Sequence, residues 1–344
     1  MFRTSLLYKL ITQKKKMENI KLKRRLSNLC LALSLSISAT ALITYSNTTI
    51  AAPNINIQNV LQQERIWAGL QTKKLKVGEI EWVYSEGGQT SKPTIILVHG
   101  LAGSRDNWNR VARYLTPNYH VIIPDLPSQG DTKVADDFDL SIPNLTEKLR
   151  RFAEAGHFEK DVNIAGHSMG GAIALLYTAQ YPTETKSLLL VDSAGVFKTA
   201  NTPYLKNPAL LNDLVVKKSG DFDRLFQLVT ASPPFIPTEL KSEQEKLMIS
   251  QSQSTQHMVD QLVAMSKVYT PETFAIAAKS IDVPTYIVWG DKDKIINVEA
   301  AQELKDLLKN AEAPLILKDV GHMPILEADQ ILAQQYLIFL NKHK

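Results

Sequence analysis

Two hydrophobic patterns alternate along the chain: short runs of consecutive apolar residues, and stretches in which apolar residues recur every three or four positions. The first pattern is typical of strands buried on both faces, and the second is typical of amphipathic helices. The apolar runs predict strands at 94–98, 121–123, 162–166, 187–192, 285–289 and 315–317, with a hairpin over 75–84 before them. The helical patterns lie at 53–71, 108–115, 145–155, 300–308 and 325–340, and a further helix follows Ser168. Strands that alternate with helices predict an α/β fold with a doubly wound, mostly parallel sheet.

This alternation stops at about residue 196 and resumes at about residue 271. The residues between contain helical patches and a proline-rich hinge at 232–237, but no clear buried strand. We therefore expect a core built from 53–195 and 271–344, with a helical cap, 196–270, inserted between the two parts. The 344 residues, of which 44% are apolar, suffice for one large domain with such an insertion.

The positive charge of the chain is concentrated at its front. Residues 1–52 hold nine Lys and Arg and one acidic residue, which leaves 30 of the 39 basic and 34 of the 35 acidic residues for the rest of the chain. The remainder is therefore mildly acidic and has no electrostatic reason to bind nucleic acid.

The same segment, 1–52, has the pattern of an export signal. Basic residues cluster at 21–25, an apolar stretch covers 29–45, and small residues follow at 49–52. This order predicts either a signal that is cleaved or an anchor that is retained, so the protein is expected to be periplasmic, secreted or anchored to a membrane. The single cysteine, Cys30, lies in this segment, so the mature chain would contain no disulfide.

The stretch 162–174 carries the clearest chemical signal. An apolar run ends at Gly166, the chain turns at Ser168, and a helix of small residues follows. A G-x-S-x-G sequence between a strand and a helix holds the serine hydroxyl on a strained turn at the sheet edge. Gly166 and Gly170 suit that turn because bulkier side chains beside the serine would clash. We therefore predict that Ser168 is a nucleophile, which needs a histidine base oriented by a carboxylate.

His322 is the predicted base, because it lies between the last strand and the last helix. Loops that follow strands gather at one edge of a parallel sheet. His99 also follows a strand, but its glycine-bounded loop indicates a structural role or a role in an oxyanion loop. His167, inside the turn, is expected to point away from the reacting centre.

The carboxylate partner of His322 is less narrowly defined by the sequence. Asp291 and Asp293 both follow the strand at 285–289, and either fits the chain order Ser, Asp, His. Asp192 follows the preceding strand and is a competing candidate.

Acyl transfer also needs hydrogen-bond donors for an oxyanion. We predict the backbone N–H groups of Met169, which follows the nucleophile, and of Leu101, in the loop after the strand 94–98. That loop lacks the lysine and the spacing of a nucleotide-binding loop, and no His, Cys or Glu spacing suggests a metal site. We expect no cofactor and no metal.

Together these residues resemble the α/β-hydrolase superfamily over about 75–340. The resemblance rests on His99-Gly100, Asp125-Leu126-Pro127, the turn at 166–171, the stretch 289–293 and Gly321-His322. It implies that the triad acid is the second Asp of the G-D-x-D turn, which is Asp293 here.

A narrower similarity is to bacterial family V lipases and to monoacylglycerol-lipase-like serine esterases. It rests on the turn at 166–171, on 190–195 and on the cap stretch 233–235. It implies a carboxylic ester hydrolase that acts on acyl glycerols or similar lipids through a Ser-Asp-His triad and an acyl-enzyme. A carbon–carbon bond hydrolase, an acyltransferase and a catalytically idle lipid-binding protein are the alternatives.

A cap of this kind would supply apolar walls for an acyl chain. The candidate wall residues are Phe222, Leu225, Phe226, Leu228, Val229, Phe235, Ile236 and Leu262. We predict that Phe226, Phe235 and Ile236 contact substrate. The expected partners are a lipid or small ester and a membrane surface, reached through the N-terminus or the cap, and the expected state is a monomer.

Overall fold

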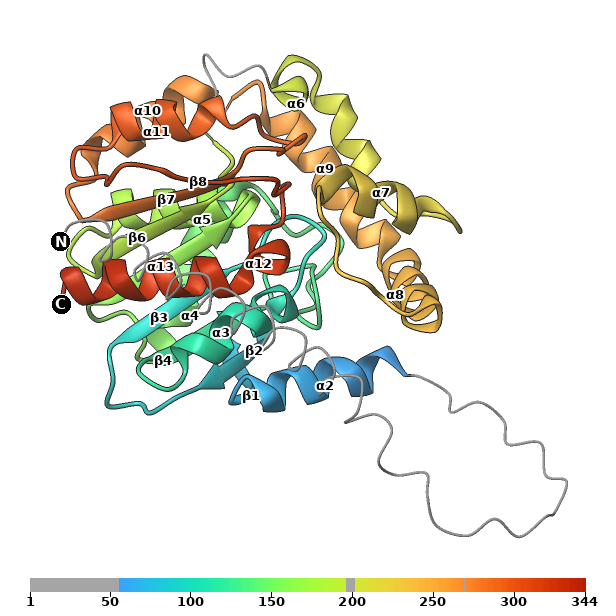
Figure 1. The fold of residues 1–344 in the computed structure, drawn as a ribbon, viewed down its shortest axis with the longest axis horizontal. Coiled ribbons are helices and arrows are strands. Elements are labelled where there is room, and N and C mark those ends of the chain that lie inside the picture. The colour runs from blue at the N-terminus through green and yellow to red at the C-terminus, as the bar shows by residue number, and fades with distance from the viewer. Residues whose placement is uncertain (1–55, 196–201, 269) are drawn as a thin grey trace, which may run out of the picture. The chain divides into compact units, whose positions relative to one another are not determined.

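An eight-stranded sheet forms the centre of the described part of the molecule, with strand order β1-β2-β4-β3-β5-β6-β7-β8 (Figure 1). The structure is a computed structural model and describes residues 56–195, 202–268 and 270–344. The strands are β1 (Leu70–Val77), β2 (Ile80–Gly87), β3 (Thr94–Val98), β4 (His120–Pro124), β5 (Val162–His167), β6 (Thr185–Val191), β7 (Thr285–Gly290) and β8 (Leu315–Leu317). The pairs β1–β2 and β2–β4 are antiparallel, and the other neighbours are parallel. The predicted mostly parallel sheet and the hairpin are thus confirmed.

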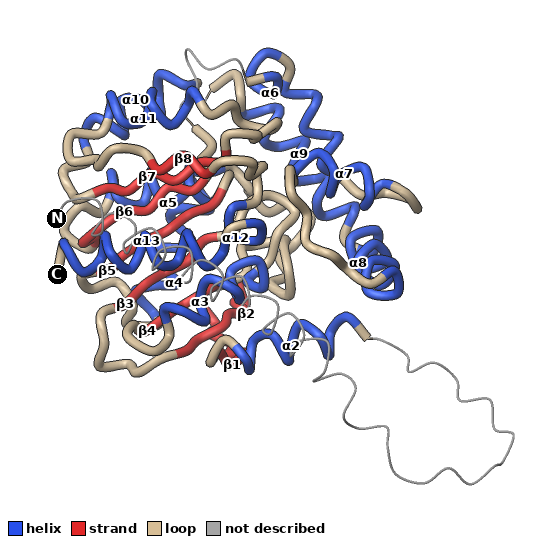
Figure 2. Tube along the Cα trace, viewed as in Figure 1, coloured by secondary structure: helices blue, strands red, loops and turns tan. Residues whose placement is uncertain are grey.

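Helices cover both faces of this sheet (Figure 2). Alternate residues of the central strands pack on opposite faces, as a strand period of two requires. Ile95 and Leu97 of β3 share a buried cluster with α3 (Asn109–Leu115) and α13 (Asp329–Lys342). Their neighbours Ile96 and Val98 share another with α4 (Ile142–Ala155), α5 (Met169–Gln180), α10 (Pro271–Ser280) and α11 (Glu299–Leu307). Burial on both faces explains why these strands are continuous apolar runs.

The predicted closing helix is wrong in one respect, because it is two helices. The short α12 (Pro324–Glu327) ends at Ala328, whose φ of −138° and ψ of 31° are not helical, and α13 follows. The break leaves the Glu327 carboxylate beside the preceding loop, where it accepts the backbone N–H of Gly321 at 2.9 Å.

Between β6 and β7, the described residues form helices and no strand. They are α6 (Pro203–Lys206), the 3-10 helix η2 (Pro208–Leu214), α7 (Asp221–Val229), α8 (Thr238–Ser250), α9 (Ser252–Met265) and α10. In Figure 1, α7, α8 and α9 lie together beside the sheet rather than on either of its faces. Val216, Phe222 and Leu225 form a small buried cluster within this region. The predicted start of the cap at 196 and the whole export segment 1–52 lie outside the described ranges, and the predicted end of the cap at 270 lies next to a residue outside them.

Helix α2 (Ile57–Trp67) precedes β1 and is held against the core by an ion pair. The Arg65 guanidinium contacts both carboxylate oxygens of Asp106 at 2.6 Å, in the 3-10 helix η1 (Arg105–Trp108). A bidentate pair of this kind fixes orientation as well as distance. Within the described ranges, no helix is both long enough and apolar enough to cross a membrane.

Candidate active site

Ser168 sits on a strained turn between β5 and α5. Its φ is 54° and its ψ is −123°, values that side-chain-bearing residues rarely adopt. The turn leaves no room for side chains at either glycine. A Cβ on Gly166 would lie 2.1 Å from the Gly170 carbonyl oxygen, and a Cβ on Gly170 would lie 2.3 Å from the Val98 carbonyl oxygen. The Ser168 N–H donates to the Val191 carbonyl at 3.0 Å, which ties the turn to the end of β6.

A chain of two hydrogen bonds leads away from the Ser168 hydroxyl. His322 Nε2 lies 2.9 Å from Ser168 Oγ, and His322 Nδ1 lies 2.8 Å from Asp293 Oδ2. The other oxygen of Asp293 accepts the N–H groups of Ile295 and Ile296 at 2.7 and 3.0 Å. Since Nδ1 donates to the carboxylate, Nε2 is left to accept the serine proton. The loops after β5, β7 and β8 thus bring the three predicted residues together.

Asp291, the alternative acid, faces elsewhere. Its Oδ1 accepts the N–H of Asp319 at 2.7 Å, and its Oδ2 pairs with Lys292 at 3.2 Å. Asp291 is therefore a turn residue, and Asp293 is the one that contacts His322.

Asp192, the other alternative, lies buried behind this chain. Its Oδ1 accepts the Gly290 N–H at 3.0 Å. Carboxylate oxygens of Asp192 and Asp293 and a ring nitrogen of His322 lie within 4.8 Å of one another, close enough to suggest a metal site. His322 Nδ1 and Asp293 Oδ2 are, however, hydrogen-bonded to each other, so the arrangement fits a proton-transfer chain better than a set of ligands.

The expectation that His167 points away from the reacting centre is wrong. Its ring lies 5.0 Å from that of His322, and its Nε2 donates to the His322 carbonyl oxygen at 2.6 Å. Burial, together with His322, lowers the pKa of His167 to about 3, so the ring is neutral. His167 therefore holds the backbone of the His322 loop, a contact that only the folded turn reveals.

His99 fixes the loop that contains Leu101. Its Nε2 accepts the Leu126 N–H at 3.0 Å, and its Nδ1 donates to the Gly100 carbonyl at 2.9 Å. Burial lowers the pKa of His99 to about 4, which keeps this neutral tautomer. The next residues are held by a buried ion pair of Arg105 with Asp125. This is the structural alternative that the sequence left open for His99.

The N–H groups of Leu101 and Met169 both lie at this end of the sheet. Leu101 lines the same cavity as Ser168. Met169 is the first residue of α5, where a helix leaves N–H groups without an intrahelical acceptor. Neither N–H takes part in the turn and loop hydrogen bonds of the described residues.

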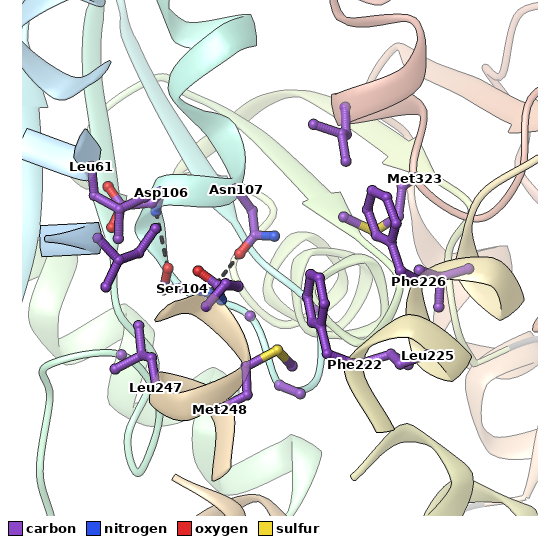
Figure 3. Close-up of a pocket in the computed structure, with 18 of the residues that line it drawn as sticks. Leu61, Ser104, Asp106, Asn107, Phe222, Leu225, Phe226, Leu247, Met248 and Met323 are labelled. Atoms are coloured by element: carbon purple, nitrogen blue, oxygen red, sulfur yellow. Dashed lines mark hydrogen bonds between the residues drawn. The ribbon is translucent and has the colours of Figure 1, made fainter. Parts of the chain in front are cut away.

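An apolar cavity of about 380 Å³ adjoins Ser168 and His322. Figure 3 shows side chains from three regions converging on it: Leu61 of α2, Phe222 and Phe226 of α7, and Leu247 and Met248 of α8. The predicted contacts Phe226, Phe235 and Ile236 all line the cavity. Phe235 lines the cavity although it is 92% exposed.

The sequence misjudged part of this lining. Leu228 and Leu262, two of the candidate wall residues, pack against the main core instead. The contributions of α2 and α8 were missed, because neither segment carries a chemical motif.

A scan against known families decides the identity of the fold. The family described as the alpha/beta hydrolase fold matches residues 93–329. The chain belongs to this family.

The relatives of this α/β hydrolase are named as lipases. It is 32% identical to Lipase 1 of Psychrobacter immobilis, over 91% of this chain and 97% of that protein. It is 33% identical to Lipase 3 of Moraxella sp., over 91% of this chain and 98% of that protein. These relationships identify a lipase-like carboxylic ester hydrolase.

Solved structures agree. A crystal structure of a lipase candidate, lip1 of Acinetobacter baumannii AYE, shares 62% identity over 85% of this chain and 98% of that chain, with a TM-score of 0.83. A membrane phospholipase A shares 31% identity over 93% of this chain and 98% of that chain, with a TM-score of 0.79. A serine hydrolase involved in carbazole degradation and a 2-hydroxy-6-oxo-6-phenylhexa-2,4-dienoate hydrolase of Rhodococcus sp. strain RHA1, at 22% and 21% identity, share the fold alone.

Proposed function

We propose that this α/β hydrolase cleaves carboxylic esters of lipids, most simply acyl glycerols, through a Ser168-His322-Asp293 triad and an acyl-enzyme. The observation that carries the proposal is the pair of hydrogen bonds at 2.9 and 2.8 Å that links the serine hydroxyl, the imidazole and the carboxylate beside an apolar cavity. All the residues invoked come from one chain. The lipase names of the relatives support the choice of substrate class.

In the first half of the reaction, Ser168 Oγ attacks the ester carbonyl carbon while His322 Nε2 accepts the hydroxyl proton. Asp293 orients the ring and stabilises its positive charge. The N–H groups of Leu101 and Met169 stabilise the oxyanion of the tetrahedral intermediate. His322 then gives its proton to the leaving alcohol, and the acyl group stays on Ser168.

In the second half, a water molecule attacks the acyl carbon while His322 Nε2 takes its proton. The tetrahedral intermediate collapses, the proton returns to Ser168 Oγ, and the fatty acid leaves. We propose that the acyl chain lies among Phe226, Phe235 and Ile236, since apolar surface stabilises bound methylenes by about 0.8 kcal/mol each.

The first test is hydrolysis of p-nitrophenyl esters from acetate to palmitate by the purified full-length protein. Ser168→Ala is expected to lower turnover by about 10⁶-fold, as removal of a serine nucleophile does in a serine hydrolase. Ser280→Ala, an exposed serine on α10, is the matched control and is expected to be fully active. Hydrolysis that survives in Ser168→Ala would refute the mechanism, and activity limited to acetate would refute the lipid substrate.

We also propose that residues 1–52 export the protein and that 196–270 act as a cap over the site. The similarity to a membrane phospholipase A is compatible with the first of these proposals. Cell fractionation with N-terminal sequencing of the mature protein tests it. A cytoplasmic protein that retains its first residues would contradict export.

A further inference from the structure

Asp192 is a buried acid with no role in the mechanism above. It follows β6 in a left-handed backbone conformation, with φ of 42°, and its side chain is fully buried. Its N–H donates to the Val288 carbonyl at 3.1 Å, and its Oδ1 accepts the Gly290 N–H at 3.0 Å. Its Oδ2 is buried and has no hydrogen-bond partner in the described structure. A buried polar atom without a partner calls for an explanation.

The neighbouring carboxylates of Asp192 and Asp293 accept different numbers of hydrogen bonds from the protein. Asp293 receives three donors, from His322 and from the N–H groups of Ile295 and Ile296, whereas Asp192 receives one. Two carboxylates in one buried site cannot both be ionised at low cost. The negative charge therefore belongs on Asp293, and the proton on Asp192.

The groups that face Asp192 agree with this division. Burial raises the pKa of Asp192 well above its usual range, and the neighbouring Asp293 and, to a smaller extent, Glu327 raise it further. Glu327 comes from α12, and His322 comes from the loop before it. The hydrogen bond from the Gly290 N–H acts in the opposite direction and lowers the pKa of Asp192.

We infer that Asp192 is a neutral carboxylic acid that donates its Oδ2 proton to the Asp293 carboxylate, and so positions the acid of the proposed triad. The inference rests on the proposed function. Asp192 supplies a fourth donor to Asp293 and orients it toward His322 without adding a second negative charge. Asp192 touches neither substrate nor the reacting atoms, so it is a positioning residue.

Two substitutions separate this role from the alternatives. Asp192→Asn keeps a neutral side chain of the same shape, whose carbonyl can accept from Gly290 and whose amide can donate to Asp293. Asp192→Ala removes both contacts. We expect Asp192→Asn to keep kcat within about threefold of the wild type, and Asp192→Ala to lose about 10- to 100-fold in kcat with little change in KM, the effect of losing one hydrogen bond to a charged acceptor.

The pH profile of kcat/KM distinguishes a neutral Asp192 from an ionised one, which a measurement of stability alone would not do. Because Asp192 is already neutral, Asp192→Asn is expected to leave the acidic limb of kcat/KM against pH in place. An ionised Asp192 would stabilise the imidazolium, and its replacement by Asn would move that limb to lower pH by about one unit or more. Such a shift, or an Asp192→Asn variant as impaired as Asp192→Ala, would overturn the inference.

Infrared spectroscopy tests the proton directly and does not depend on activity. At pH 8, the difference spectrum of the wild type minus Asp192→Asn is expected to contain the carbonyl stretch of a protonated carboxyl group, and its absence would overturn the inference. Ser168→Ala, assayed alongside, keeps the two proposals apart. If Ser168→Ala remains active, the proposed function fails, whereas a failure of the Asp192 tests beside an inactive Ser168→Ala refutes the inference alone.

Discussion

At the scale of single residues, the site is built from side chains whose protonation is fixed by burial. His99 and His167 are both fully buried and neutral, and each uses its ring to hold a loop rather than to exchange protons. His322 is the histidine of this group whose ring contacts a serine hydroxyl on one side and a carboxylate on the other. Three histidines within one region can thus have different tasks, set by their hydrogen-bond partners.

The neutral state of His167 predicts a pH effect on stability. In the unfolded chain its imidazole takes up a proton below about pH 6.5, whereas in the folded protein it does so only near pH 3. The stability that its neutral form contributes is therefore present above pH 6.5 and is lost as the pH falls toward 3. His167→Gln retains a donor for the His322 carbonyl but does not titrate. Between pH 7 and 4.5, we expect the free energy of unfolding of the wild type to fall by about 2–3 kcal/mol more than that of the variant.

Urea unfolding of the two proteins at both pH values measures this difference. His257→Gln is a suitable control, because His257 lies on α9, away from the cavity. Parallel pH dependences of the wild type and His167→Gln would contradict the assignment of a buried neutral ring.

The sequence predicted the site residues whose position after a strand already implies where they lie in the fold. Ser168, Asp293 and His322 each follow a parallel strand, and such loops meet at one edge of the sheet. The same argument could not choose among Asp192, Asp291 and Asp293, because all three follow strands. The choice depends on the directions of the side chains within the folded loops. The structure gives these directions, because Asp291 contacts Asp319 whereas Asp293 contacts His322.

At the scale of elements, α12 links the His322 loop to the hinge between α7 and α8. The Glu327 carboxylate accepts the Gly321 N–H through Oε1 at 2.9 Å. Its Oε2 accepts the N–H groups of Ala231 and Ser232, in the hinge between α7 and α8, at 2.8 and 2.6 Å. One side chain, at the end of α12, thus joins two segments about 90 residues apart.

Substitution of Glu327 by Gln tests this link. The amide has one oxygen to accept hydrogen bonds from the three N–H groups, and its NH2 group faces the N–H groups that lose their acceptor. We therefore expect the free energy of unfolding to fall by about 1–3 kcal/mol. We also expect kcat to fall, because the loop before His322 loses its support. Thermal unfolding and ester turnover measure the two effects, and Glu154→Gln, which breaks an exposed helical ion pair, is the control and should change neither by much. Wild-type behaviour of Glu327→Gln would mean that α12 does not support the loop.

Elements differed in how well the sequence predicted them. The central strands β3 to β7 are buried on both faces and are therefore largely continuous apolar runs, which a sequence reveals directly. Among the helices between β6 and β7, α8 has no fully buried residue, so its sequence gives little indication of the face on which it packs. The division of the closing helix into α12 and α13 lies at Ala328, whose non-helical backbone the apolar pattern over 325–340 does not indicate.

At the scale of the whole molecule, the cavity is assembled from parts of the chain that fold as separate elements. Helix α2 lines one side, the loop after β3 carries Leu101, and α7 and α8 close the other side (Figure 3). The ion pair of Arg65 with Asp106 locks α2 against the loop region, and α2 also contacts α8. The shape of the cavity is therefore a property of the fold rather than of any one segment.

This assembly predicts that the wall of the cavity formed by α8 limits the length of the acyl chain. Met248 lines the wall on α8, and Met248→Trp would fill space there while leaving the region of Ser168 unchanged. Each methylene that loses its place costs about 0.8 kcal/mol, so the loss of two or more would lower kcat/KM for palmitate by about tenfold or more. We expect kcat/KM for acetate to stay within about twofold of the wild type. Met265→Trp, on α9 and outside the lining, is the matched control. An equal loss on acetate and palmitate would indicate a general disturbance of the site, and no loss on either ester would mean that the acyl chain lies elsewhere.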